Sequence, residues 1–210
     1  MGRITALRVD SSKKRVKVFV DGFSAFVIDE EVAVRADLRV DQYLSTAQIE
    51  ELTQASLFQN CFDAALRYLS YRPRSEAEVR QRLHRRGFGN EVADRVMIEL
   101  RRRGLVDDIA FARFWKDNRL LFSPRSRQLM KMELIQKGIA TEITGEIIED
   151  LDDEISAYEA GLKKARVLGA LGYDEFCRRL SGYLRRRGFS YEVIDHVSAR
   201  LWQEQQTSSE

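Results

Sequence analysis

Two pairs of adjacent carboxylates, Asp107-Asp108 and Asp152-Asp153, are the residues of this chain that most resemble catalytic groups. Neighbouring carboxylates serve general acid-base catalysis, in which one group donates a proton and the other accepts one. Each pair, however, stands at the start of a predicted helix, where aspartate accepts hydrogen bonds from free amides and complements the helix dipole. We interpret both pairs as helix caps, and the sequence predicts no enzyme active site.

Histidine, cysteine and aromatic residues do not form a recognisable site either. His84 and His196 lie more than a hundred positions apart and have no companions at ligand spacing, which argues against a metal site or a catalytic triad. Cys61 and Cys177 lie in helical patterns without a CxxC motif, as buried thiols of a reducing compartment do. A group with helical spacing is interpreted as core rather than as a base-stacking platform: Phe111, Phe114 and Trp115.

Basic residues stand in threes directly before a glycine, at His84-Arg85-Arg86, Arg101-Arg102-Arg103 and Arg185-Arg186-Arg187. Cations at a helix C-terminus complement the helix dipole, but three successive residues fan over about 200° of the helix surface. Residues 62–106 carry 11 basic groups, all arginine, against 6 acidic ones, whereas the other segments are nearly balanced. Two interpretations remain open: the arginines of residues 62–106 bind an anionic partner, or they only cap helices and interact with solvent.

The elements that must position these groups follow a repeat anchored on Gly87, Gly138 and Gly188. Apolar residues stand eight and four positions before each glycine and one, five, nine and thirteen positions after it. Steps of four follow one helix face, so each copy predicts a helix, a left-handed glycine that ends it, and a second helix. The stripe in the three copies is Val79, Leu83, Phe88, Val92, Val96 and Leu100; Met130, Leu134, Ile139, Ile143, Ile147 and Leu151; Leu180, Leu184, Phe189, Val193, Val197 and Leu201.

The spacing of about 50 residues leaves room for a further helix before each pair, at Asn60–Tyr71, Ile109–Phe122 and Ile155–Gly169. We therefore predict a mainly α protein with three tandem three-helix repeats in an elongated curved array, over residues 60–106, 107–151 and 152–204, and a polar tail at 205–210. Ser75 and Ser126, each after a proline corner, are predicted N-caps, and Asp174 is the predicted cap in the third repeat.

Residues 1–59 predict a small β-rich segment. Apolar and polar residues alternate over Ile4–Val9, Arg15–Val20 and Phe23–Ile28, and Asp21-Gly22 is a strong hairpin turn signal. A helical turn at Asp29–Ala36 and a helix opened by the capping box of Ser45 and Gln48 follow. No apolar run reaches the length of a membrane span and no signal-peptide core is present, so we expect a cytoplasmic protein.

Several segments in order resemble one family: ALRYLSYRPRSEAEVRQRL, GLVDDIAFARFWKDNRLLFSPRS, MELIQKGI and YLRRRGFSYEVIDHV. They resemble RecX, the bacterial regulatory protein of the RecA recombinase, over about residues 60–202. The first 60 residues resemble an extension that some members carry.

The resemblance implies a non-enzymatic regulator of homologous recombination, DNA repair and the SOS response. Such proteins bind along the groove of a RecA filament on DNA and limit its assembly, ATP hydrolysis and strand exchange. The partners implied are RecA and, weakly, single- or double-stranded DNA, with no cofactor, membrane or small-molecule substrate. The alternative is a stand-alone DNA-binding helical-repeat protein.

The candidate residues for binding a partner are all arginines: Arg72, Arg74, Arg80, Arg82, Arg85, Arg86, Arg101, Arg102, Arg103, Arg119, Arg125 and Arg127. Further positions match family motifs and are expected to be structural: Asp107, Asp108, Phe111, Ala112, Gly87, Gly138 and Gly188.

Overall fold

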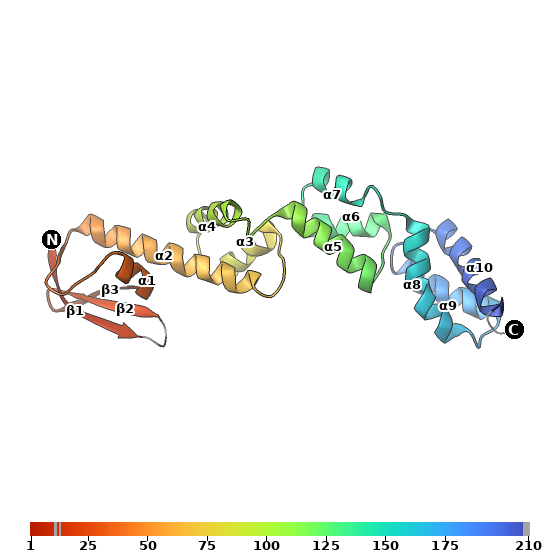
Figure 1. Ribbon diagram of the computed structural model, residues 1–210, viewed down its shortest axis with the longest axis horizontal. Helices are drawn as coiled ribbons and strands as arrows, with labels where there is room; N and C mark the ends of the chain where they lie inside the picture. Colours follow the sequence, from red (N-terminus) through yellow and green to blue (C-terminus); the bar gives the residue numbers. More distant parts are fainter. Residues whose placement is uncertain (11, 13, 208–210) are drawn as a thin grey trace. The chain divides into compact units, whose positions relative to one another are not determined.

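The structure is a computed structural model that describes residues 1–10, 12 and 14–207 (Figure 1). Its strands are β1 (Gly2–Asp10), β2 (Arg15–Val20), β3 (Phe23–Asp29) and β4 (Tyr43–Leu44). Its helices are α1 (Glu30–Arg35), α2 (Thr46–Leu69), α3 (Glu76–Arg85), α4 (Asn90–Arg102), α5 (Asp108–Phe122), α6 (Arg127–Gln136), α7 (Thr141–Ile148), α8 (Asp153–Leu168), α9 (Tyr173–Arg185) and α10 (Tyr191–Thr207). The mainly α fold with a small β-rich start is as predicted.

The chain forms two compact units. One comprises Met1–Arg72 and Val79–Val106, and the other comprises Pro73–Glu78 and Asp107–Glu210. The proline corner before α3 thus belongs with the second and third repeats, while most of α3 belongs with the first.

The N-terminal segment is an antiparallel sheet in the order β3-β2-β1-β4. Alternation along β2 sends Val16 and Val18 into a core with Ile28, Val32 and Leu44, while the intervening residues face away. The sequence missed β4, and the sheet therefore has four strands instead of the expected three. The predicted tight turn is confirmed, because Asp21 and Gly22 both have positive φ.

Helix α2 corrects one prediction. The helix expected at Asn60–Tyr71 is the second half of α2, which runs without a break from the capping box at Ser45. The predicted boundary between residues 59 and 60 thus lies inside a helix that contributes Ser56 to the N-terminal segment, where its hydroxyl accepts a hydrogen bond from the Asp29 amide. Downstream, the same helix contributes Cys61, Phe62 and Ala65 to the first repeat.

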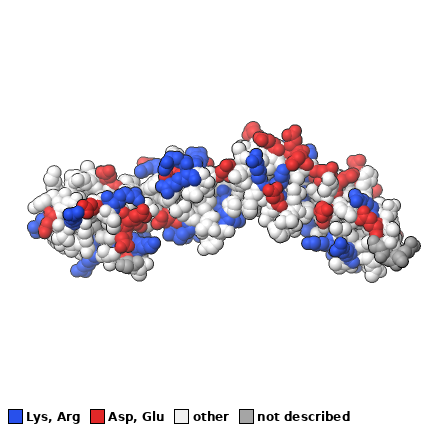
Figure 2. Space-filling model, viewed as in Figure 1, with Lys and Arg blue, Asp and Glu red and all other residues white. Residues whose placement is uncertain are grey.

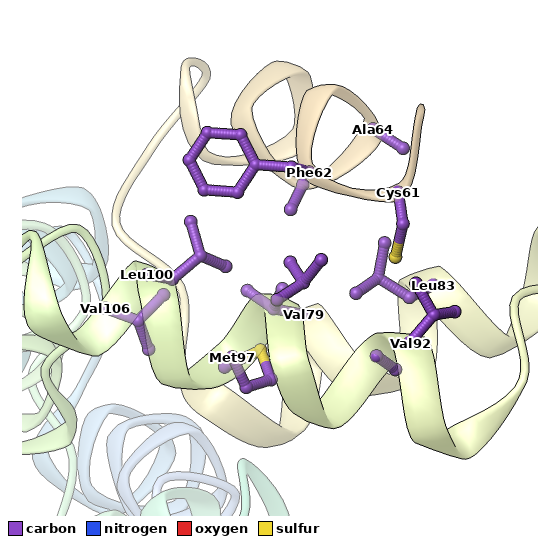
Figure 3. Packing of buried hydrophobic residues seen from close by; sticks show 12 residues of the cluster. Cys61, Phe62, Ala64, Val79, Leu83, Val92, Met97, Leu100 and Val106 are labelled. Carbon is purple, nitrogen blue, oxygen red and sulfur yellow. The ribbon is translucent and has the colours of Figure 1, made fainter. Parts of the chain in front are cut away.

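The first repeat has a core between α2, α3 and α4 (Figure 3). Val79 and Leu83 of α3 and Val96 and Leu100 of α4 are fully buried, as their spacing predicted. Burial of the Cys61 side chain raises the pKa of its thiol to about 11. The second and third repeats have equivalent cores, one around Met130 and Leu134 and one around Leu180 and Leu184.

The three anchor glycines all adopt the left-handed conformation, with φ of +86° at Gly87, +82° at Gly138 and +85° at Gly188. They differ in their surroundings. A side chain at Gly87 would meet open space, a Cβ at Gly138 would collide with the Ala77 Cβ, and a Cβ at Gly188 would lie 2.6 Å from the Ser126 hydroxyl. The second and third glycines therefore also serve close packing between neighbouring repeats.

A serine and an aspartate make corresponding contacts at the joints between successive repeats, although the serine donates through its hydroxyl at the first joint and through its amide at the second. The Ser75 hydroxyl donates to the carbonyl of Lys137, directly before Gly138, at 2.6 Å, and the Ser126 amide donates to the carbonyl of Arg187, directly before Gly188, at 3.0 Å. The second aspartate of each pair completes the joint: Asp108 accepts from the Glu76 amide at 2.8 Å, and Asp153 accepts from the Arg127 amide at 2.6 Å.

The first aspartate of each pair caps its own helix. Asp107 accepts hydrogen bonds from the amides of Ile109 and Ala110, and Asp152 accepts from those of Glu154 and Ile155. Ser75 and Ser126 cap α3 and α6 through the amides three residues on. The predicted cap at Asp174 was wrong, because α9 begins at Tyr173, two residues before a cap at Asp174 would place its start. Gly172 takes the N-cap position without a side-chain hydrogen bond.

Candidate partner-binding surface

Arginines of the first repeat gather on one helix. Figure 2 shows Lys and Arg side chains concentrated over α4. Helix α4 carries Arg95, Arg101 and Arg102, and Arg103 is its C-cap. Arg95, Ile98 and Arg102 are three and four positions apart and so follow one face of the helix. Ile98 is 59% exposed between the two cations. We call Arg95, Ile98, Arg101, Arg102 and Arg103 the α4 face.

A carboxylate and two phenyl rings fix these arginines. Arg102 donates two hydrogen bonds to Glu99 at 2.7 Å, and Arg103 donates a third at 2.6 Å. The guanidinium of Arg103 also lies 4.8 Å from the ring centre of Phe62, and that of Arg95 lies 5.5 Å from Phe58. These contacts hold the guanidinium groups in position at the surface, so less side-chain freedom is lost when a partner binds.

The charge of this group stays fixed over the physiological pH range. Hydrogen bonds from Arg102 and then Arg103 lower the pKa of Glu99 to about 2. Glu99 is therefore ionised together with both arginines, and the three side chains carry one net positive charge.

The C-terminal end of α3 adds exposed cations. Arg82 lies 5.6 Å from the ring centre of Tyr68, and Arg85 and Arg86 are exposed beside Gly87. Within the described part of the chain, neither Arg85 nor Arg86 forms an ion pair.

Several candidate arginines instead stabilise the fold. Arg80 pairs with Asp94 within the first repeat. Arg119 and Arg125 both bind Glu133, whose side chain is only 11% exposed and also accepts from the Trp115 indole at 2.9 Å. Arg127 donates to the carbonyls of Glu149 and Leu151, which follow the end of α7. Arg72 and Arg74 are half-buried at the proline corner.

The other motif residues also have structural positions. Phe111 and Ala112 are buried in the core of the second repeat, as expected, and the Phe111 ring packs at a tilt against Trp115, with ring centres 5.9 Å apart. The cationic groups of Arg119 and Lys137 both lie over the Trp115 ring. Lys137 also forms an ion pair with Glu78 at 2.7 Å. This network joins the start of α3 to the second repeat.

The search for basic triplets before a glycine did not identify Arg95 and Ile98, because neither residue stands beside a glycine. Their spacing from Arg102 on a helix with an otherwise buried apolar stripe was the signal that could have revealed them.

The described residues hold no group of three metal-ligating side chains and no helix that is long and apolar enough to cross a membrane. The α4 face offers fixed cations around an exposed apolar side chain, a composition suited to binding an acidic partner.

Comparisons with known proteins agree with this architecture. Residues 61–100 match the family model of the first three-helix domain of RecX, and residues 152–197 match that of the third. The regulatory protein RecX of Clostridium perfringens is 26% identical over 207 residues, covering 96% of this chain and 97% of the relative. That of Lactobacillus gasseri is 29% identical over 202 residues, covering 94% and 74%.

Solved structures show the same fold. A crystal structure of regulatory protein RecX superimposes with a TM-score of 0.68 at 22% identity, over 95% of this chain and all of that one. RecX from Lactobacillus salivarius gives a TM-score of 0.59 at 24% identity, over 70% and 97%. Matching three-helix domains, relatives that align along nearly the whole chain and a shared fold lead to one conclusion: this chain belongs to the RecX family.

Proposed function

We propose that this chain is a regulatory protein that binds the RecA filament on DNA and restrains its assembly, ATP hydrolysis and strand exchange. Membership of a family whose relatives are named regulatory proteins supports this role. In this role the chain acts in the cytoplasm as a binding protein, without catalysis or a cofactor. Its partners are RecA and, more weakly, DNA.

The α4 face is the observation that carries the proposal for where the partner binds. A filament on DNA presents phosphates and acidic side chains, which fixed guanidinium groups pair with well. Exposed Ile98 stands between Arg95 and Arg102, and arginine is among the residue types that most often dominate binding energy. Among the three repeats, the first also has the largest excess of basic over acidic residues, 11 against 6.

A stand-alone DNA-binding array is the rival function. It would track phosphates along its length and should be basic throughout, whereas residues 107–151 carry 7 basic and 8 acidic groups and residues 152–204 carry 9 of each. Figure 2 shows Asp and Glu gathered over α7 in the second repeat. A steep salt dependence of DNA binding, reporting many neutralised phosphates, would favour the rival.

The test is the DNA-dependent ATPase of the cognate RecA, measured with this protein well below equimolar ratio. We expect lower hydrolysis and shorter filaments in electron micrographs. Unchanged hydrolysis together with unchanged filament length would refute RecA regulation.

The chain contains a matched control for the α4 face. In the third repeat Arg178 and Arg179 bind Glu175 with the same spacing and at 2.6 to 2.8 Å, as Arg102 and Arg103 bind Glu99. We expect R102A/R103A to weaken ATPase inhibition at least tenfold, about 1.4 kcal/mol, and R178A/R179A to do less. Both variants should lower the melting temperature only slightly and by similar amounts, since each removes exposed ion pairs of the same geometry. Equal losses in the two variants would remove the α4 face from the proposal.

A further inference from the structure

The charges of the N-terminal segment are separated along the chain. Residues 1–20 carry six basic side chains and one acidic one, whereas residues 21–59 carry two basic and eight acidic ones. Summed over the whole segment these charges cancel, so the near-neutral total conceals a basic β1-β2 hairpin. Whether a partner can reach these excess basic side chains depends on which face of the sheet they occupy.

Two of these cations lie side by side on the outer face of the sheet. Arg8 of β1 stands directly opposite Lys17 of β2, and both are exposed. Val16 and Val18, on either side of Lys17, point into the core, so Lys17 must point away from it. Directly opposed cross-strand residues have Cβ atoms about 5 Å apart, and like charges at this spacing destabilise a sheet.

One aromatic ring holds the pair in place. The guanidinium of Arg8 lies 5.0 Å from the ring centre of Phe19, and the ammonium of Lys17 lies 5.4 Å from it. Each contact is an attraction between a cation and a ring face. Among the described residues neither Arg8 nor Lys17 forms an ion pair with a carboxylate, so the repulsion between them is not neutralised from within the chain.

The neighbouring basic residue stands opposite an acidic residue instead of another cation. Arg15 stands opposite Asp10 in the register of the same two strands, with opposite charges facing each other. The next position along the Arg8-Lys17 row, on β3, is Val27, which is also exposed. The un-neutralised part of the face thus consists of two fixed cations beside the half-buried Phe19 and an apolar side chain.

We propose that this hairpin face, formed by Arg8, Lys17, Phe19 and Val27, binds a single strand of nucleic acid. Two adjacent phosphates would remove the repulsion between Arg8 and Lys17, and the apolar side chains would contact the bases that only a single strand leaves open. Phe19 acts as a positioning residue, because it fixes both cations before the ligand arrives. This inference rests on the weak DNA binding named in the proposed function and gives it a surface. It is tested in the absence of RecA, so its failure would leave the proposed RecA regulation standing.

The test uses the full chain and a fluorescent oligothymidylate, with anisotropy measured from low to moderate salt. The variant is R8T/K17T, because threonine favours strands and both positions are exposed. Losing two phosphate contacts should lower the steepness of log affinity against log salt by about 1.4, or 0.7 for each contact on a single strand. We expect affinity at low salt to fall at least tenfold.

Two cations in the same segment provide the control. Arg35 pairs with Glu31 at 2.8 Å and Arg39 pairs with Asp37 at 2.7 Å, so R35Q/R39Q removes the same charge from sites that are already neutralised. This control should bind the oligonucleotide as the unmodified chain does. The conservative variant R8K/K17R should retain binding as well.

Folding is checked in the same samples. Removing the opposed like charges should leave the melting temperature of R8T/K17T unchanged or raised. An unaltered salt dependence in R8T/K17T, or an equal change in R35Q/R39Q, would overturn the proposal. Loss of binding to a polyglutamate peptide without loss of binding to the oligonucleotide would overturn it too, in favour of an acidic polypeptide.

Discussion

Replacing Gly138 with alanine should destabilise the chain more than the same change at Gly87. Both residues have nearly the same left-handed backbone, with φ of +82° and +86°, so both variants meet the same conformational penalty of about 1 to 2 kcal/mol. At Gly87 the new methyl group enters open space. At Gly138 it collides with the Cβ of Ala77, which has no rotamer into which it can withdraw, so the helix itself must shift.

Overpacking of this kind costs about a further 1 to 3 kcal/mol. In a chain of this length each kcal/mol corresponds to a change of about 2 to 4 °C in melting temperature. We therefore expect G87A to lower the melting temperature by about 2 to 8 °C, and G138A to lower it by at least 2 °C more, as followed by circular dichroism.

A second substitution separates collision from backbone strain. A77G removes the methyl group that G138A would strike, so the double variant should recover the extra loss but not the part shared with G87A. A coupling between the two sites of about 1 kcal/mol or more is expected, since they are in contact. Equal melting temperatures for G87A and G138A, or no recovery on adding A77G, would show that the joint between repeats is not closely packed here.

Three further measurements test the cores and the charges. Leu83, Leu134 and Leu184 are fully buried at equivalent positions, so each change to alanine should cost about 2 to 5 kcal/mol of unfolding free energy in urea titrations; three nearly neutral variants would contradict the repeat alignment. Burial raises the pKa of Cys61 to about 11, so iodoacetamide at pH 8 should label it only in urea, and labelling of the folded chain would contradict its burial. The pKa of Glu99 is lowered to about 2, below its ordinary value of 4.5, so its contribution to stability is present above pH 4.5 and is lost as pH falls towards 2; NMR titration should show this pKa rising in R102A/R103A, and no rise would contradict the pairing.

The repeats could be predicted because their signals are local. A glycine that ends a helix and apolar residues four positions apart belong to one short segment, and the burial of Leu83, Leu134 and Leu184 follows from them. Strand β4 could not be found in this way, because two residues become a strand only by pairing with Gly2 and Arg3, some forty positions earlier.

The wrong start of the helix expected at Asn60 has a different cause. No glycine or proline interrupts residues 46–69, and the uninterrupted run already favoured one helix. Dividing it followed from imposing the length of the other repeats. Tertiary contacts on both halves of α2 support the longer helix, which local periodicity does not reveal.

The candidate surface was only partly predictable, because charge counts do not show which arginines are already paired. Arg119 and Arg125 meet over Glu133 only after the chain has turned the corner at Pro124. Conversely, Arg102 and Arg103 pair within their own helix and stay at the surface. Exposure and the position of the nearest carboxylate separate these cases, and both depend on the fold.

In two places, an aspartate of one repeat accepts a hydrogen bond from the start of a helix in the repeat before it, and this order matters during synthesis. The acceptor of the Glu76 amide, Asp108, is synthesised 32 residues later, and the acceptor of the Arg127 amide, Asp153, is synthesised 26 residues later. At about 5 to 20 residues per second, the start of α3 or α6 leaves the ribosome about 1 to 6 s before its last partner is made. Helix α9 has Gly172 at its N-cap position without a side-chain hydrogen bond, so within the described residues no later carboxylate completes the start of this helix.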